Sequence, residues 1–381
     1  MNTSLVWAEV DLKAIAHNVQ ALRKITSSKA RLMAVVKADA YGHGVLQVTR
    51  QALENGADVL AVARLNEGIQ LRKAGFDVPI LIFGYTPPKH AKQLVEFDLT
   101  QTVWSFKTAA ALGAEVASGR PIKIHLKVDT GMGRLGLLPD CFRKASATKI
   151  ALQEVESIAS LPGLELEGIY THFAAADSAD KSYAKKQFEI FLDFLDQLRK
   201  AGLAIPVRHA ANSAALIDMP ETHLDLVRPG ISIYGLYPSD EVDKSRILLK
   251  PAMSLKARIV HLKQVPAGFK VSYSMTYETS KPTTIASVPI GYADGFSRLL
   301  SNQSYMLVGG CRAPIVGRVC MDQTMLDVGH VPDVKLEDEV VIFGKQQDES
   351  IFVDEIAASI NTINYEIVSS LTARIPKIYL S

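Results

Sequence analysis

Cysteine is scarce in this 381-residue sequence, and its charges almost balance. Cys141, Cys311 and Cys320 are odd in number and lack metal-ligand spacing, so they predict neither a disulfide framework nor a metal site. So few cysteines fit a reducing compartment. The formal net charge is +2, and no block of like charges occurs, which argues against a dedicated nucleic-acid surface.

Long apolar runs are also missing. No uninterrupted run approaches the length that spans a membrane, and residues 1–11 lack the basic flank and apolar core of a signal peptide. Internal repeats and low-complexity segments are absent too. Hydrophobic residues still make up 48% of the chain, enough for a sizeable core. We therefore expect a soluble cytoplasmic protein with two domains, or one large domain with an addition, and no membrane partner.

Strand and helix patterns alternate over the first 240 residues. Eight apolar strand candidates lie at 32–36, 58–63, 79–83, 99–103, 122–128, 166–171, 206–210 and 225–234. Helical patterns lie at 12–25, 45–55, 66–74, 88–95, 106–118, 140–159 and 181–201, with a short one after Asn212. This alternation predicts βαβ units and a parallel sheet, and eight strands fit a closed (β/α)₈ barrel. The alternative is an open doubly wound sheet, but the Gly-x-Gly-x-x-Gly turn typical after its first strand is absent.

A polar connection near residues 239–245 precedes a second kind of pattern. Short strands with turn residues between them are predicted at 252–262, 283–289, 305–308, 313–316, 323–328 and 338–343, and only 353–360 looks helical. We expect a barrel over residues 11–240 and a mostly β C-terminal domain over 241–381. The N-terminal strand, residues 1–10, is expected to associate with the C-terminal domain.

The first unusual stretch is Val-Val-Lys-Ala-Asp-Ala-Tyr-Gly-His-Gly at residues 35–44. A buried strand ends here on Lys37, the place where a barrel presents a catalytic side chain. A desolvated lysine has a lowered pKa and can form a Schiff base with a carbonyl. A surface lysine after an ordinary strand is the alternative.

The second stretch, His-Leu-Lys-Val-Asp-Thr-Gly-Met-Gly-Arg-Leu-Gly at residues 125–136, also follows a strand. Its glycines let the backbone approach a ligand closely, and Arg134 is a charged fork suited to a carboxylate or phenolate oxygen. Lys127 lies inside an apolar strand, where an unpaired ammonium is costly. A strand-edge salt bridge followed by a glycine turn would give the same pattern.

Three further strand ends carry polar residues. His172 could be an acid or base, although a structural histidine is as common. Asn212 and Ser213 stand where a helix begins, an arrangement that suits an anion and equally suits simple capping. Arg-Pro-Gly-Ile at residues 228–231 interrupts the eighth strand candidate at Pro229-Gly230, and phosphate sites in barrels often use the loops after strands seven and eight.

Together these stretches resemble the sequence motifs of alanine racemases, enzymes that use pyridoxal 5′-phosphate (PLP). The resemblance runs from about Trp7 to the C-terminus and continues in the segments 271–277, 289–295, 317–323 and 361–366. One departure is Ser274, which stands where the family usually has glycine. Cys320 could instead be a reactive nucleophile, but the sequence shows no helix N-terminus or neighbouring base that would activate its thiol.

The resemblance implies a role in the active site for each of the following residues. Lys37 and Tyr273 would be the two catalytic bases, serving the D- and L-enantiomer respectively. Cofactor-binding residues would be Lys37, Tyr41, Arg134, His172, Ser213, Arg228, Gly230, Ile231 and Tyr365. Arg134 and the backbone N–H of Met321 would bind the substrate, while Lys127, which is commonly carbamylated in the family, His209 and Tyr292 would support the site.

The function implied is the interconversion of L- and D-alanine, supplying D-alanine for peptidoglycan. The family also implies a homodimer whose active sites are shared between subunits. A racemase for serine or several amino acids remains open, because pocket residues separate these substrates by small steric differences. A PLP-binding barrel without turnover is the other alternative, although such proteins usually lack the β domain.

Overall fold

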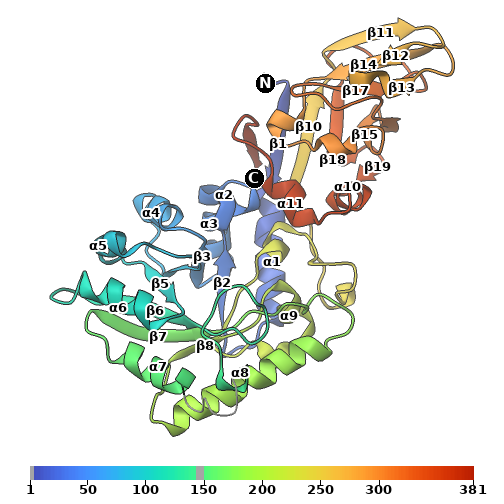
Figure 1. Ribbon diagram of the computed structural model, residues 1–381. Helices are drawn as coiled ribbons and strands as arrows, with labels where there is room; N and C mark the ends of the chain where they lie inside the picture. Colours follow the sequence, from blue (N-terminus) through green and yellow to red (C-terminus); the bar gives the residue numbers. More distant parts are fainter. Residues whose placement is uncertain (1–3, 143–149) are drawn as a thin grey trace. The chain divides into compact units, whose positions relative to one another are not determined.

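The computed structural model describes residues 4–142 and 150–381, and it divides into two compact units (Figure 1). The barrel unit comprises Ala14–Ala40 and Val45–Pro251. The β-rich unit comprises Tyr41–Gly44, Ala252–Ser381 and the N-terminal residues up to Lys13.

The barrel unit is built on eight parallel strands in the order β8-β7-β6-β5-β4-β3-β2-β9. Two backbone hydrogen bonds join the ends of this order: Asp225 N donates to Arg208 O at 3.1 Å, and Arg228 N donates to Ala211 O at 3.0 Å. The (β/α)₈ architecture is therefore confirmed. The strands are β2 (Arg31–Val35), β3 (Val59–Val62), β4 (Ile80–Ile82), β5 (Thr100–Val103), β6 (Ile122–Lys127), β7 (Leu164–Tyr170), β8 (Val207–His209) and β9 (Leu226–Val227).

The segments between the strands form helices, because their apolar residues recur on one helical face that packs against the barrel. In α1 (Leu12–Ile25) the buried positions Ile15, Val19 and Leu22 are three or four residues apart. One helix was expected at 140–159. The structure has a short 3₁₀ turn, Asp140–Phe142, and the helix α7 (Ile150–Ala159), and residues 143–149 lie outside the described residues. The other helices are α3 (Val45–Glu54), α4 (Leu65–Lys73), α5 (Ala91–Glu96), α6 (Phe106–Ala114), α8 (Ser182–Lys200) and α9 (Ser213–Asp218).

The β-rich unit is organised around β1 (Val6–Asp11), which pairs antiparallel with β10 (Met253–Arg258) and parallel with β20 (Lys377–Leu380). Its main sheet has the order β16-β15-β18-β10-β1-β20, with β19 on β18, and smaller sheets are β11-β14-β17 and β12-β13. The remaining elements are β11 (His261–Val265), β12 (Lys270–Val271), β13 (Tyr277–Glu278), β14 (Thr283–Val288), β15 (Tyr305–Val308), β16 (Cys311–Pro314), β17 (Thr324–Asp327), β18 (Glu339–Gln346), β19 (Glu349–Ile351), α10 (Val353–Ser359) and α11 (Asn364–Ser369).

The two units divide at Pro251, eleven residues later than the expected end of the barrel at residue 240. Residues 241–251 stay with the barrel because they are bonded to it. Tyr237 donates its hydroxyl to Ile247 O at 2.7 Å, and Lys250 N donates to Asn18 Oδ1 at 2.8 Å. The polar residues near 240 are therefore a surface segment of the barrel unit.

Several expectations for the β-rich unit need correction. The strand expected at 252–262 is two strands, β10 and β11, and helix α11 was not expected. Tyr273 lies in a three-residue 3₁₀ turn, Tyr273–Met275, flanked by the two-residue strands β12 and β13, which were not expected either. Ser272 and Ser274 have positive φ angles of 66° and 60°, so the chain reverses direction here and cannot continue as a strand.

Candidate active site

The turn after β2 has an unusual backbone. Ala38, Asp39, Ala40 and Tyr41 all have φ between 52° and 54°, so α2 (Lys37–Tyr41) is a left-handed turn made entirely of L-residues. Such a conformation costs roughly 1–2 kcal/mol per residue. Two carboxylates stabilise it: Glu67 Oε1 accepts from Ala38 N at 2.6 Å, and Asp39 Oδ1 accepts from Val45 N at 2.8 Å. The turn is therefore a strained conformation that the surrounding barrel holds in place.

Lys37 is the first residue of this turn, two residues beyond the end of β2. Burial lowers the pKa of its ammonium, and the positive charge of Arg134 lowers it further, against the opposing effect of Glu67. A lysine with a lowered pKa has more of the neutral amine, the form that attacks carbonyl carbon. The structure therefore gives Lys37 the environment of a nucleophilic lysine.

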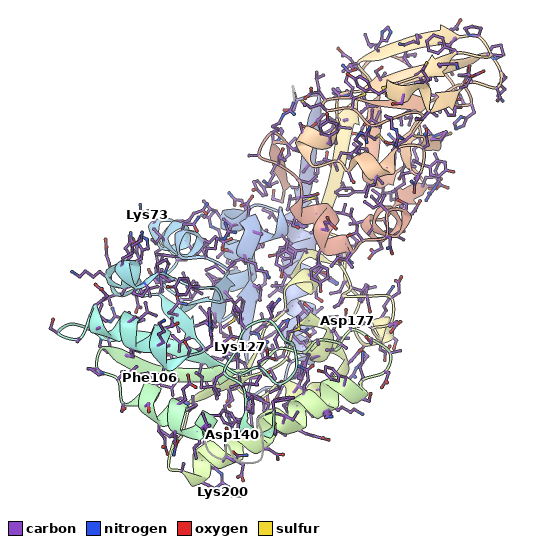
Figure 2. The ribbon with its side chains drawn as sticks, viewed as in Figure 1. Lys73, Phe106, Lys127, Asp140, Asp177 and Lys200 are labelled. Carbon is purple, nitrogen blue, oxygen red and sulfur yellow. The ribbon has the colours of Figure 1, made fainter. Side chains whose placement is uncertain are left out.

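The end of β6 carries a buried lysine, Lys127, which is labelled within the barrel unit in Figure 2. Lys127 is 4% exposed, and its Nζ donates to Val128 O at 2.8 Å and lies 5.5 Å from the centre of the Tyr170 ring. Burial and the charge of Arg228 lower the pKa of Lys127 to about 7. At neutral pH this lysine is therefore divided between its charged and neutral forms.

The loop after Lys127 is shaped by Asp129. Its carboxylate accepts backbone N–H bonds of 2.8–3.1 Å from Gly131, Met132 and Gly133. Gly131 has φ 124°, and a Cβ there would lie 2.5 Å from the Tyr183 hydroxyl. This tight loop leads to Arg134, whose side chain is exposed.

Arg228 is held by acceptors from two neighbouring segments, residues 171–172 and 209–210. Its Nη1 donates to His209 Nδ1 at 3.0 Å, and its Nη2 donates to Thr171 O and Ala210 O, both at 2.9 Å. Nη2 also lies 3.3 Å from His172 Nδ1. Burial lowers the pKa of Arg228 to about 10, so the guanidinium keeps its charge at neutral pH.

Of the two histidines around Arg228, His209 is buried and His172 is half-buried, and both are neutral. Burial, followed by the charge of Arg228, lowers the pKa of both His172 and His209 well below the usual value. The ring of Tyr170 stacks on His209 with centroids 4.6 Å apart and planes 10° apart. Burial raises the pKa of Tyr170 to about 12. Arg228 is therefore surrounded by neutral groups that accept hydrogen bonds without cancelling its charge.

Ser213 joins the loops that follow β8 and β9. Asn212 caps α9 by accepting from Ala215 N at 3.0 Å, as expected, while Ser213 Oγ accepts from Gly230 N at 2.8 Å. The neighbouring Ile231 begins a 3₁₀ turn, Ile231–Tyr234. The structure therefore brings together Ser213, Gly230 and Ile231, three residues that the sequence resemblance associates with one phosphate.

The β-rich unit gathers the remaining candidates in two places. The rings of Tyr41 and Tyr365 have centroids 6.1 Å apart. Elsewhere, Ser272 Oγ, beside Tyr273, donates to Arg318 O at 2.6 Å.

The chain near Met321 is bonded in turn to the segment of Tyr292. Tyr292 N donates to Cys320 O at 3.1 Å, and Ala293 N donates to Met321 O at 3.0 Å. Tyr273, Met321 and Tyr292 are exposed by 71%, 53% and 43%. These three residues therefore stand on connected loops with their side chains open to solvent.

Three residues with clear structural roles in the site were not predicted. Glu67 anchors the left-handed turn, Tyr170 stacks on His209, and His125 places its Nδ1 2.8 Å from His209 Nε2. His125 belongs to the motif at 125–136, but its position inside an apolar strand gave no sign of its partner. Glu67 has only the weak signal of an acidic residue in the first turn of α4.

Comparison with known proteins assigns the family. The profile of the alanine racemase N-terminal domain matches residues 10–238, and that of the C-terminal domain matches residues 252–379. The chain belongs to the alanine racemase family. Alanine racemases are PLP-dependent isomerases, so the enzyme class expected from the motifs is confirmed.

Individual alanine racemases are similar over the whole chain. That of Desulfosudis oleivorans is 54% identical over 380 residues, covering 100% of this chain and 97% of the relative. That of Methanococcus maripaludis is 51% identical over 377 residues, covering 98% of both. Among solved structures, alanine racemase of Bacillus anthracis with bound L-Ala-P gives a TM-score of 0.93 at 40% identity, covering 100% of this chain and 96% of that one. Alanine racemase of Clostridium difficile 630 gives a TM-score of 0.92 at 39% identity, covering 100% of this chain and 97% of that one.

Among residues 4–142 and 150–381, every helix is too short or too polar to cross a membrane.

Proposed function

We propose that the chain interconverts L-alanine and D-alanine with PLP bound covalently to Lys37. The observation that carries this proposal is the environment of Lys37, a half-buried amine with a lowered pKa at the end of a barrel strand. Lys127, Arg228 and Ser213 follow other strands of the same parallel barrel, and the carboxyl ends of those strands share one face. These side chains would therefore surround one ligand.

The donors present fit PLP part by part. Ser213 Oγ and the backbone of Gly230 and Ile231 would hold the phosphate. The hydroxyls of Tyr41 and Tyr365, whose rings lie 6.1 Å apart, would hold it as well. Arg134 would approach the phenolic oxygen and the substrate carboxylate, where its fork can form two hydrogen bonds.

Arg228 would face the pyridine nitrogen. A guanidinium has no lone pair and can only donate, so the ring nitrogen would remain unprotonated. PLP supplies an electron-withdrawing system when bound, and a neutral ring withdraws electrons less strongly than a charged one. This favours returning a proton to the substrate carbon, as racemisation requires, over proton transfer to the cofactor, as in transamination.

Racemisation needs a proton removed from one face of the α-carbon and another added to the opposite face. We assign Lys37 to the face used for D-alanine and Tyr273 to the face used for L-alanine. His172 would bond to Tyr273 and connect it with Arg228, and Met321 N–H would bind the substrate carboxylate. Tyr292, with its exposed ring, would stand near the substrate entrance.

Lys127 would act through Arg134. With a pKa of about 7, a large share of its amine is neutral at physiological pH, and that is the form that adds carbon dioxide. The carbamate formed, with release of one proton, is an anion that can hold the Arg134 guanidinium. This inverts the charge of a lysine whose desolvation is otherwise unfavourable.

The proposed assembly is a homodimer with shared active sites, and the proposed role is to supply D-alanine for peptidoglycan. The deciding experiment incubates the purified, PLP-loaded protein separately with L-alanine, D-alanine, L-serine and D-serine, and follows each enantiomer by chiral chromatography. We expect conversion of both alanine enantiomers to a 1:1 mixture, with serine slower. Binding of PLP without conversion of any amino acid would reject the proposal, and faster conversion of serine would correct its substrate.

A further inference from the structure

A row of four side chains, which we call the histidine network, crosses the barrel behind the proposed cofactor site. It consists of Arg228, His209, His125 and Glu167. Arg228 Nη1 lies 3.0 Å from His209 Nδ1, and His209 Nε2 lies 2.8 Å from His125 Nδ1. His125 Nε2 faces Glu167 Oε2 at 3.5 Å. Arg228 follows β9, and β8, β6 and β7 carry the other three, so four strands of one barrel contribute one side chain each.

The end groups fix where every proton lies. Arginine can only donate, so His209 Nδ1 must accept and its proton must be on Nε2. That N–H donates to His125 Nδ1, which leaves the proton of His125 on Nε2, facing Glu167. An ionised carboxylate only accepts, and it therefore completes a row in which every N–H points away from Arg228.

Burial keeps the two imidazoles neutral between the charged ends. His209 and His125 are 0% and 4% exposed, and burial lowers the pKa of each. The bond to His125 lowers the pKa of Glu167, which favours its carboxylate form. Glu167 is 29% exposed and borders a cavity of about 20 Å³, large enough for a single water.

The backbone of β7 makes room for this arrangement. Gly168 lies opposite His125 in the pairing of β6 with β7, and a Cβ there would stand 2.6 Å from the His125 ring. A side chain at this position would displace the imidazole. Gly168 and a local shift in register between Ile124 and His125 thus place the ring against His209.

We propose that His125 and Glu167 are positioning residues for the reaction, which hold His209 in its Nε2–H tautomer so that it accepts from Arg228. This inference rests on the proposed function, in which Arg228 faces the cofactor ring. In the opposite tautomer, His209 would point an N–H at the guanidinium, and Arg228 would lose one acceptor and shift. The Glu167 carboxylate selects the tautomer from two side chains away.

The direct test is ¹⁵N NMR of histidine-labelled protein, with and without PLP, because the nitrogen shifts separate the two neutral tautomers. We expect His209 and His125 of the wild-type protein to be in the Nε2–H form. Either histidine in its Nδ1–H form would overturn the proposal without any mutation. Assignment uses the single variants His125→Asn and His209→Asn.

Variants of Glu167 test its control over His209. Glu167→Leu should mix the tautomers of His209 and lower kcat about tenfold with little change in KM, while Glu167→Gln, whose amide oxygen still accepts, should keep most of the activity. Glu165→Leu is the matched control, since Glu165 is an exposed residue on the same strand. An unmixed His209 in Glu167→Leu would reject the proposal.

The two hypotheses fail separately. A protein with the expected tautomers but no racemisation would overturn the proposed function alone. A racemase with His209 in the other tautomer would overturn only this inference.

Discussion

The phenol rings of Tyr41 and Tyr365 lie with their centroids 6.1 Å apart and their planes inclined by 49°. The residues are distant in sequence, yet both belong to the β-rich unit. Gly42, next to Tyr41, has φ 82°, and a Cβ there would lie 2.2 Å from Val368 O of α11, the helix that carries Tyr365. This close backbone approach brings the two tyrosines together.

The first prediction concerns this pair. Tyr365→Phe removes one hydroxyl from the proposed phosphate site, and a hydrogen bond to a charged group contributes roughly 1.5–3 kcal/mol. We expect the dissociation constant of PLP to rise about tenfold or more by that estimate, measured by fluorescence titration of the protein stripped of cofactor. Tyr305→Phe, at the exposed first residue of β15 in the same unit, is the control and should leave the constant unchanged.

Lys37 should carry the cofactor. Reduction of the PLP-loaded protein with borohydride fixes the Schiff base as a stable amine, and peptide mapping by mass spectrometry then locates it. We expect the phosphopyridoxyl group on Lys37, since burial lowers the pKa of this lysine. The buried Lys127 is the internal comparison, and a label found there would contradict the assignment.

Arg228 should determine the type of reaction as well as its rate. Arg228→Glu replaces a donor by a carboxylate, which would allow the pyridine nitrogen to hold a proton. We expect a new long-wavelength absorbance band with alanine, racemisation slower by at least tenfold, since an interaction with a charged group is lost, and some transamination. Arg208→Glu, at the exposed middle residue of β8, is a comparison for the charge change alone. A spectrum and rate like those of the wild-type protein would show that Arg228 does not face the ring.

Shared active sites predict complementation between inactive variants. Lys37→Ala and Tyr273→Phe should each be nearly inactive. After random subunit exchange, about half of the dimers would be mixed, each with one intact site of two, so roughly a quarter of the wild-type activity should return per subunit. Exchange is followed independently with differently tagged subunits. Exchange without any return of activity would place Lys37 and Tyr273 of one chain in the same site.

The buried histidines predict loss of stability in mild acid. Burial lowers the pKa of His125, His172 and His209 in the folded state below the unfolded value of roughly 6.5. The unfolded chain therefore binds more protons below that pH, and the stabilisation present above pH ~6.5 is lost progressively as pH falls toward the folded-state values.

Each of these histidines should contribute a slope of up to ~1.4 kcal/mol per pH unit. We expect the urea concentration at the midpoint of unfolding to decrease as the pH is lowered from 7.5 to 5.5. His125→Asn should remove the contribution of one proton to this slope, up to ~1.4 kcal/mol per pH unit. A midpoint independent of pH over this range would contradict the prediction.

The sequence contained the barrel and most of its chemistry. Alternating apolar runs and amphipathic helices gave all eight strands, because period and length are local properties that a chain shows without its fold. The positions of Lys37, Lys127 and Ser213 at strand ends followed from the same patterns. Recognition of the family came from short motifs whose residues are close in sequence.

Tertiary structure decided what depends on residues far apart in the chain. The left-handed turn after Lys37 runs against the preference of its four L-residues and exists because Glu67 and Asp39 bond its ends. Tyr273 lies on a reversing turn between two strands of two residues each, which are too short to be seen in the sequence pattern. The row from Arg228 through His209 and His125 to Glu167 is invisible in sequence, because its members come from four segments that meet only when the parallel strands close around one axis.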